Sequence, residues 1–194
     1  MPRPDGRYKL KQLILYVASK MREADYFGVT KLNKVLYRAN ISSYQEIGRK
    51  LTEFKFQKNT RGPTLRAFVP ITQEMESDGL LGWDSRPRGP VNERRPLARV
   101  EPDMSVVPAE ELVYVDREIS RAWSLTGKQM SAEEHVTAAW YALRTGETIA
   151  PELSFVEDPG NSMPLSTQEE ERAHAAIERY RARTRASSHP RSST

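Results

Sequence analysis

The apolar positions of the first fifty residues recur at helical spacing. From Lys9 onward they repeat every three or four residues, which places them on one face of a helix. This first stripe consists of Leu10, Leu13, Ile14, Val17 and Met21. After Gly28 a second stripe predicts another helix, with Thr30 as its N-cap and an end near Tyr44. The second stripe consists of Leu32, Val35, Leu36 and Ala39.

The helical spacing is lost after Gly48, and short extended segments take its place. Residues 51–57 alternate loosely and are rich in Phe and Thr, which favours a strand. A second alternation, of Leu65, Ala67 and Val69, follows a turn at 61–63. The pattern therefore predicts a small β-element between helices.

The next stretch is interpreted as a short helix and a long loop. Thr72 is expected to cap a helix that ends at Gly79. Residues 83–96 are dense in Arg, Pro and Gly, which is typical of a mobile loop. A strand over 97–101 is expected to follow.

Two further helices are predicted in the C-terminal half. Pro108 suits the first position of a helix whose apolar face holds Leu112, Val115, Ile119 and Trp123 and which ends at Thr126-Gly127. Ser131 and Glu134 have the S-x-x-E form of a capping box, which would open a helix that carries His135 and Trp140 and closes at Gly146.

The fold class expected from these elements is mainly α (α+β), with one helical domain and a small β-element. The domain covers residues 8–155, after a flexible lead-in over 1–7. A linker at 156–165, an added C-terminal helix at 166–183 and a disordered tail at 184–194 complete the chain. A narrow apolar stripe marks that last helix, at Ala173, Ala176, Ile177 and Tyr180.

Charge is spread unevenly along the chain of 194 residues. Residues 1–68 hold 15 Lys or Arg and 5 Asp or Glu, whereas the rest hold 15 and 21. A basic first third attracts acidic partners, either nucleic acid or an acidic protein. The alternative is that these basic residues form the solvated faces of ordinary helices.

Composition excludes several classes of protein. The chain has no cysteine, so disulfides and thiolate sites are excluded. It has neither a signal peptide nor an apolar run of about 18 residues that could span a membrane, so a cytoplasmic location is expected.

Catalytic and cofactor motifs are also missing from the sequence. It contains no glycine-rich phosphate loop, no G-x-S-x-G elbow and no H-E-x-x-H pair, so no cofactor and no metal site is expected. The one candidate general base, His135, is more typical of a structural or capping residue, and no catalytic residue is predicted.

Four segments, taken in order, resemble the Panacea-domain family of antitoxins, which includes SocA-like and phage-associated GepA-like proteins. They are Thr30–Tyr37 (TKLNKVLY), Gly48–Phe56, Arg61-Gly62-Pro63, and Thr126–Ser131 followed by His135 and Trp140. The resemblance covers about residues 8–155. It implies a mainly helical domain that neutralises a toxin from the adjacent gene by direct binding, as in type II toxin–antitoxin systems of prophages and phage defence.

The motif residues are interpreted as scaffold: Lys31, Leu32, Lys34, Leu36, Tyr37, Gly62, Pro63, His135 and Trp140. His135 and Trp140 are expected on different sides of one helix, with Trp140 in the core. Contacts with the partner are expected on more exposed elements: the basic surface of the second helix, the Arg-rich loop and the C-terminal helix. The candidate contact residues are Arg38, Arg49, Arg86, Arg88, Arg94, Arg95, Ala173, Ile177 and Tyr180.

Alternatives to the antitoxin hypothesis stay open. The basic first third could bind nucleic acid, although its aromatic residues are more readily explained as core. The Arg-rich tail could serve a proteolytic adaptor that delivers a toxin to a protease. A homodimer is a further option, and no membrane partner is expected.

Overall fold

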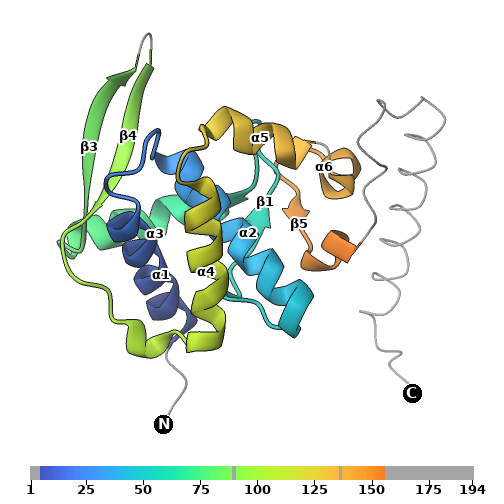
Figure 1. Ribbon diagram of the computed structural model, residues 1–194, viewed down its shortest axis with the longest axis horizontal. Coiled ribbons are helices and arrows are strands. Elements are labelled where there is room, and N and C mark those ends of the chain that lie inside the picture. The colour runs from blue at the N-terminus through green and yellow to red at the C-terminus, as the bar shows by residue number, and fades with distance from the viewer. Residues whose placement is uncertain (1–4, 89–90, 136, 156–194) are drawn as a thin grey trace, which may run out of the picture.

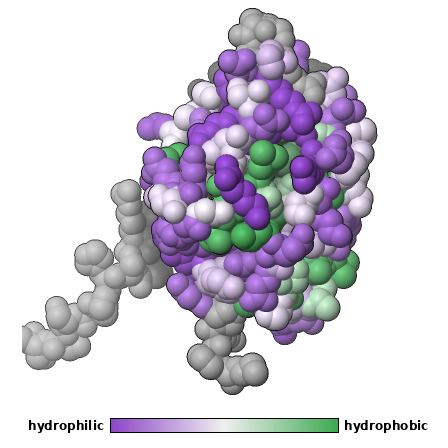
Figure 2. Space-filling model, turned by 90° about the vertical axis from the view of Figure 1, so that its left-hand side faces the viewer, coloured by the Kyte–Doolittle hydropathy of each residue, from purple (hydrophilic) through white to green (hydrophobic). Residues whose placement is uncertain are grey.

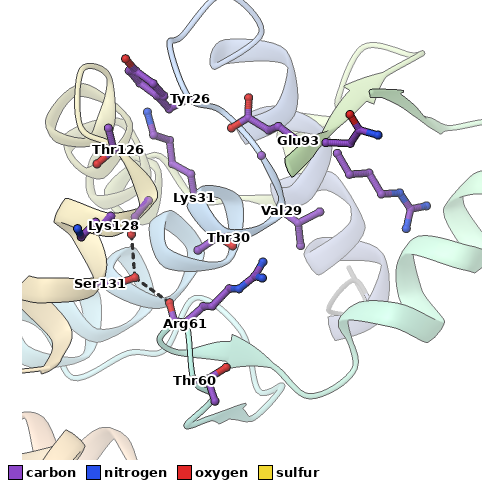
Figure 3. Close-up of a pocket in the computed structure, with 14 residues that line it drawn as sticks. Tyr26, Val29, Thr30, Lys31, Thr60, Arg61, Glu93, Thr126, Lys128 and Ser131 are labelled. Carbon is purple, nitrogen blue, oxygen red and sulfur yellow. Dashed lines mark hydrogen bonds between the residues drawn. The ribbon is translucent and has the colours of Figure 1, made fainter. Parts of the chain in front are cut away.

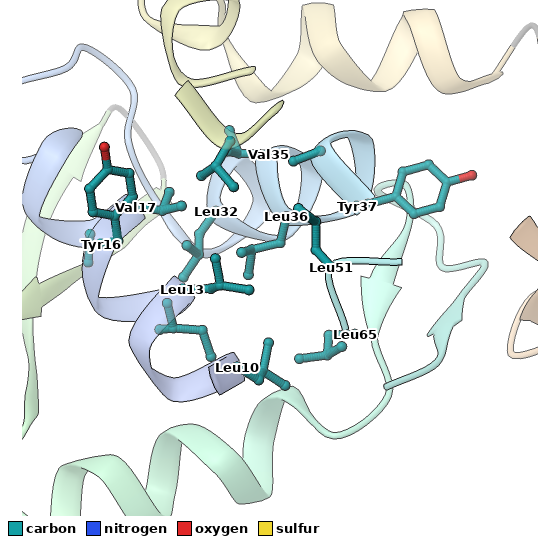
Figure 4. Close-up of a cluster of buried hydrophobic side chains, with 14 of the residues drawn as sticks. Leu10, Leu13, Tyr16, Val17, Leu32, Val35, Leu36, Tyr37, Leu51 and Leu65 are labelled. Atoms are coloured by element: carbon teal, nitrogen blue, oxygen red, sulfur yellow. The ribbon is translucent and has the colours of Figure 1, made fainter. Parts of the chain in front are cut away.

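Three helices form the body of the protein in the computed structural model, which describes residues 5–88, 91–135 and 137–155. Helix α2 (Val29–Ile47) packs against both α1 (Gly6–Lys20) and α4 (Ala109–Ala122) (Figure 1). Every member of the two predicted apolar stripes is buried, so both predictions are confirmed. In Figure 4, side chains from α1 and α2 point toward one another and enclose the core.

The ends of α1 and α2 follow from local chemistry. Asp5 caps α1, because its side chain accepts a hydrogen bond from the Arg7 N–H at 3.1 Å. The N-cap of α2 is Gly28 and not Thr30, so that prediction is wrong. A side chain at Gly28 would meet the backbone and Glu93 of a neighbouring strand, which explains a glycine there. Helix α2 ends at Ile47, because Gly48 takes a left-handed conformation with φ of 67°.

The predicted β-element is present, but its strands are short. Strands β1 (Phe56–Gln57), β2 (Thr64–Leu65) and β5 (Thr148–Ile149) form an antiparallel sheet in the order β2-β1-β5. The extended segment predicted to reach Val69 stops early, because α3 (Phe68–Ser77) begins there. Thr72 lies inside α3 and donates its hydroxyl to the Phe68 carbonyl at 2.9 Å, so it does not cap a helix.

Within the Arg- and Pro-rich stretch, residues 83–88 and 91–96 belong to two paired strands of a long hairpin, so the prediction of a mobile loop is wrong for them. Strand β3 (Leu81–Arg88) pairs antiparallel with β4 (Val91–Ala98). A two-stranded ribbon has two open edges, where a proline removes no hydrogen bond between strands. Of the strand predicted over 97–101, only the first two residues belong to β4.

The base of the hairpin packs against α1 and α3, and its far end projects from the body (Figure 1). The face seen in Figure 2 has the hairpin at its top, with apolar side chains gathered below it among polar ones. Among the described residues, no helix is both long enough and apolar enough to cross a lipid bilayer.

The C-terminal half departs most from its predicted helices. A short 3-10 helix, η1 (Met104–Val106), precedes α4, whose N-cap is Pro108. Of the predicted apolar face, Val115 and Ile119 are buried, whereas Trp123 is 44% exposed.

The single helix expected to begin at Ser131 is in fact two helices, α5 (Gly127–His135) and α6 (Ala138–Ala142). The side chain of Thr137 accepts a hydrogen bond from the Trp140 N–H and caps α6. The capping pair of α5 is Thr126 with Gln129, whose side chains each accept the other's backbone N–H, and not Ser131 with Glu134.

The described chain ends with a second 3-10 helix, η2 (Pro151–Phe155). The predicted linker, C-terminal helix and tail, over 156–194, lie outside the described residues. Residues 6 and 7 already belong to α1, so the lead-in is shorter than predicted. The expected fold class, mainly helical with small antiparallel sheets, is confirmed.

Candidate functional site

Charged side chains from three helices meet in an inner charge cluster, defined as Lys34 and Arg38 of α2, Arg121 of α4, and Glu133 and Glu134 of α5. Arg38 Nε lies 2.5 Å from Glu134 Oε1, and an Arg38 terminal nitrogen lies 3.1 Å from Glu133. Arg121 reaches Glu133 at 2.6 Å. The cluster therefore ties α2, α4 and α5 together.

Lys34 is the most enclosed member of the cluster. Its residue surface is 0% exposed, and its Nζ has no hydrogen-bond partner. It lies directly over Gly62, where an added Cβ would come within 2.1 Å of that nitrogen. Burial lowers the pKa of Lys34 to about 8, and the negative charge of Glu134 opposes this shift.

Glu134 supplies the buried negative charge of the cluster. Its side chain is 5% exposed, and burial raises its pKa against the opposing effect of Arg38 and Lys34. It lies in the last turn of α5, whereas the sequence suggested a first turn where a carboxylate favours the helix dipole. Its role is to pair buried cations.

His135 and Trp140 stack on each other, with ring centroids 4.0 Å apart and planes 25° apart. The prediction that they point to different sides of one helix is wrong, because the chain leaves α5 at His135 and starts α6 three residues later, at Ala138. Trp140 is half-buried, so its expected place in the core is also wrong.

Lys58 also contacts Trp140. Its Nζ lies 4.6 Å from the centre of the Trp140 ring and donates a hydrogen bond to the Leu143 carbonyl at 2.7 Å. Burial, followed by the charges of Lys34 and Lys58, lowers the pKa of His135. His135 Nε2 is buried and has no hydrogen-bond partner. A lowered pKa favours the neutral form of this ring.

The remaining motif residues lie in the interior. Lys31 Nζ donates to the carbonyls of Asp25 at 2.6 Å and Trp123 at 3.2 Å, which joins the start of α2 to the end of α4. Tyr37 packs edge-on against Phe56 of β1 with ring centroids 5.4 Å apart. The others are buried as well: Leu32, Leu36, Gly62 and Pro63.

Two of the predicted partner contacts are internal. Arg95 is 3% exposed and donates to the carbonyls of Arg22 at 2.7 Å and Ala24 at 3.2 Å. Arg38 belongs to the inner charge cluster, with a side chain 24% exposed. The expected basic surface of α2 is therefore absent, because Lys31, Lys34 and Arg38 all turn inward.

Three other predicted contacts are exposed. Arg49 pairs with Glu110, Arg86 pairs with Asp84 at 2.9 Å, and the Arg94 guanidinium lies 3.8 Å from the centre of the Trp83 ring. The remaining predicted contacts lie outside the described side chains: Arg88, Ala173, Ile177 and Tyr180.

Half of the described basic residues of the first third form an ion pair within the chain. Arg7 pairs with Glu74, Lys9 pairs with Glu111, and Lys11 lies 2.7 Å from Glu74. The unequal charge of the two parts of the sequence is thus in part an internal match. This match weakens the charge argument for nucleic-acid binding, and the tail that motivated the adaptor alternative lies outside the described residues.

A groove that sequence reasoning missed runs past the start of α2. It consists of two adjoining cavities, of about 520 Å³ and 310 Å³, which share Val29, Thr30, Thr60 and Arg61. We call it the Arg61 groove. In Figure 3, the Arg61 side chain extends toward the start of α2, with Lys128 and Ser131 of α5 on another side and Glu93 of β4 opposite.

The floor of the Arg61 groove is fixed by hydrogen bonds. The Ser131 hydroxyl oxygen lies 2.9 Å from the Arg61 carbonyl oxygen and 2.8 Å from the Gly127 carbonyl oxygen, and its single hydrogen is shared between these two acceptors (Figure 3). These bonds join the turn before β2 to the start of α5. Arg61 and Lys128 both belong to segments on which the family resemblance rests. Those segments could therefore have indicated this groove.

Comparison with protein-family models, with curated proteins and with solved structures finds no match for this chain. Within the described residues, no group of three or more His, Cys, Asp or Glu side chains is arranged to hold a metal ion.

Proposed function

We propose that this protein is an antitoxin that acts in the cytoplasm by binding a toxin encoded by the adjacent gene. The observation that carries the proposal is that the separate motifs meet in one interior. Lys34, from the first motif, lies over Gly62 of the turn motif. His135 and Trp140, from the last motif, stack beside them, and the charge of Lys34 contributes to the lowered pKa of His135.

This interior favours a scaffold over a catalytic centre. Lys34 is fully buried, and His135 Nε2 is buried and has no hydrogen-bond partner. A general base must come within hydrogen-bond reach of its substrate, and these atoms face packed protein. The motif residues then serve to hold α2, α5 and α6 in place, as a binding protein requires.

The projecting hairpin is the element we assign to partner contact, together with the Arg61 groove, which is lined in part by Asn92, Glu93 and Arg94 of β4. Arg86 and Arg94 are exposed on it. A two-stranded ribbon offers backbone groups along its open edges, which is a common way to bind another chain.

Co-expression tests the proposal directly. The adjacent gene is induced in cells with or without this chain, and growth is measured together with co-purification of the two products. We expect the neighbouring product to arrest growth alone, and this chain to restore growth and co-purify with it. A neighbouring product that is harmless alone, or that stays toxic beside this chain, would refute the proposal.

A hairpin variant and its matched control refine the test. Arg86→Asp with Arg94→Asp changes two exposed hairpin residues, whereas Arg49→Asp changes an exposed arginine at the far end of α2. Loss of growth rescue in the hairpin variant alone would support the hairpin as the contact.

A further inference from the structure

Two cations beside the Arg61 groove lack a negative partner. Neither Arg61 nor Lys128 forms an ion pair with any described residue, in contrast to the paired basic residues of α1 and α2. Glu93 lines the same groove but already has a partner within the chain. The fold thus pairs many of its basic residues with carboxylates but leaves these two without one at a hollow in the surface.

We infer that the Arg61 groove receives an acidic, extended segment of the partner protein, with a carboxylate placed at Arg61. This inference rests on the proposed function, because it names where and through what chemistry the toxin binds. Arg61 presents a planar guanidinium that can bind a carboxylate through two hydrogen bonds. Lys128 adds a second positive charge on the far side of the start of α2.

The rest of the lining suits a peptide chain. Polar uncharged side chains flank the cations along both cavities, among them Thr30, Thr60 and Thr64. Hydroxyl groups can donate to or accept from the backbone of an extended segment. Tyr26, which is 41% exposed at one end, offers an aromatic surface to an apolar neighbour of the acidic residue.

The backbone of the Arg61 groove is fixed by contacts within the chain. The Arg61 carbonyl is held by Ser131, and the next residue, Gly62, lies against the buried Lys34. A binding site whose backbone is already fixed loses little conformational entropy on association. This rigidity favours a short, specific contact.

A nucleic acid fits the groove less well than an acidic peptide. Binding to a phosphate backbone depends on many cations along a track, with a steep dependence on salt. Here the free cations flank one hollow, and most of the basic residues of α1 and α2 are paired internally. An acidic protein segment therefore matches the charge pattern better.

The test compares Arg61→Glu and Lys128→Glu with Arg144→Glu, which reverses an exposed cation outside the groove. Binding of each full-length variant to the purified product of the adjacent gene is measured by calorimetry. Binding of a fluorescent peptide rich in Asp and Glu is measured in parallel, with a Gln and Asn peptide as control. Circular dichroism checks that each variant is folded.

We expect each groove variant to weaken both interactions at least about tenfold, and Arg144→Glu to change them less than about twofold. If the wild type binds the neighbouring product and the groove variants bind equally well, this inference is overturned while the proposed function stands. If the wild type does not bind that product, the proposed function fails, and the acidic peptide alone decides about the groove.

If the wild type does not bind the product of the adjacent gene, peptide binding that is lost in the groove variants supports a carboxylate site in the groove. Absence of peptide binding to the wild type overturns that site. A single-stranded oligonucleotide that displaces the peptide from the wild type at lower concentration than unlabelled peptide would also overturn it, because the occupant would then be nucleic acid.

Discussion

On the two sides of the Arg61-Gly62 turn, positively charged side chains have different environments. On the inner side, Gly62 lies against Lys34, whose charge is balanced by Glu134 of the same chain. On the outer side, Arg61 faces a groove and has no ion-pair partner among the described residues. A cation enclosed by the fold needs a carboxylate or a carbonyl from the fold, whereas a cation at a groove can receive a carboxylate from another molecule.

The largest expected effect is on the inner side. Glu134→Ala should lower the free energy of unfolding by about 3–5 kcal/mol, because it leaves the buried Lys34 without the carboxylate that balances its charge and leaves Arg38 with Glu133 alone. Chemical denaturation measures this loss. The control is Glu133→Ala, whose side chain is 40% exposed and which should cost only about 1 kcal/mol. Equal losses of unfolding free energy in the two variants would contradict the distinction between the buried Glu134 and the more exposed Glu133.

The second prediction concerns pH. The folded pKa of Lys34, about 8, lies below its ordinary value of 10.5, so the unfolded chain binds more protons between these pH values. Lys34 therefore makes the free energy of unfolding rise as pH rises from about 8 to 10.5, by up to about 3 kcal/mol. Lys34→Met should remove this rise, measured by denaturation across that pH range.

Lys55→Met is the matched control, because Lys55 is exposed. It should leave the pH profile of the wild type unchanged. A Lys34→Met profile that kept the full rise would show that another group causes it.

The third prediction breaks the contact between the turn and the cluster. Gly62→Ala should cost about 2–3 kcal/mol, because the residue has φ of 112° and the new Cβ would meet Lys34 Nζ. Gly48→Ala has φ of 67° but meets nothing within 4 Å, so it should cost about 1 kcal/mol. Thermal unfolding of both variants gives the comparison.

A double-mutant cycle sharpens this result. In a Lys34→Ala background, Gly62→Ala should cost less than it does alone, because the long side chain no longer fills the space. Strict additivity of the two changes would rule out the proposed contact.

The smallest effect is expected on the outer side. Arg61→Glu and Lys128→Glu should each change the free energy of unfolding by less than about 0.5 kcal/mol, because neither cation supports the fold through an ion pair. Denaturation curves that overlay the wild type would sharpen the contrast with Glu134→Ala. A loss of several kcal/mol would show that the groove cations stabilise the fold.

The sequence by itself determined the helical body of this protein. The stripes on α1 and α2 are regular, and burial of apolar surface requires such stripes to face each other, so the periodicity predicts both helices and their core faces. The turn at Gly62 and the helix end at Gly48 could also be predicted from the sequence, because positive φ values favour glycine.

Only the tertiary structure decided where the charged side chains lie and which secondary structure the Arg- and Pro-rich stretch adopts. Whether Arg38 or Arg95 faces solvent depends on a carboxylate or a carbonyl brought from far along the chain. The hairpin forms because its base docks against α1 and α3, a contact that overrides the local preference of its prolines. The break after His135 likewise places it against Trp140, and spacing along a single helix could not predict that stack.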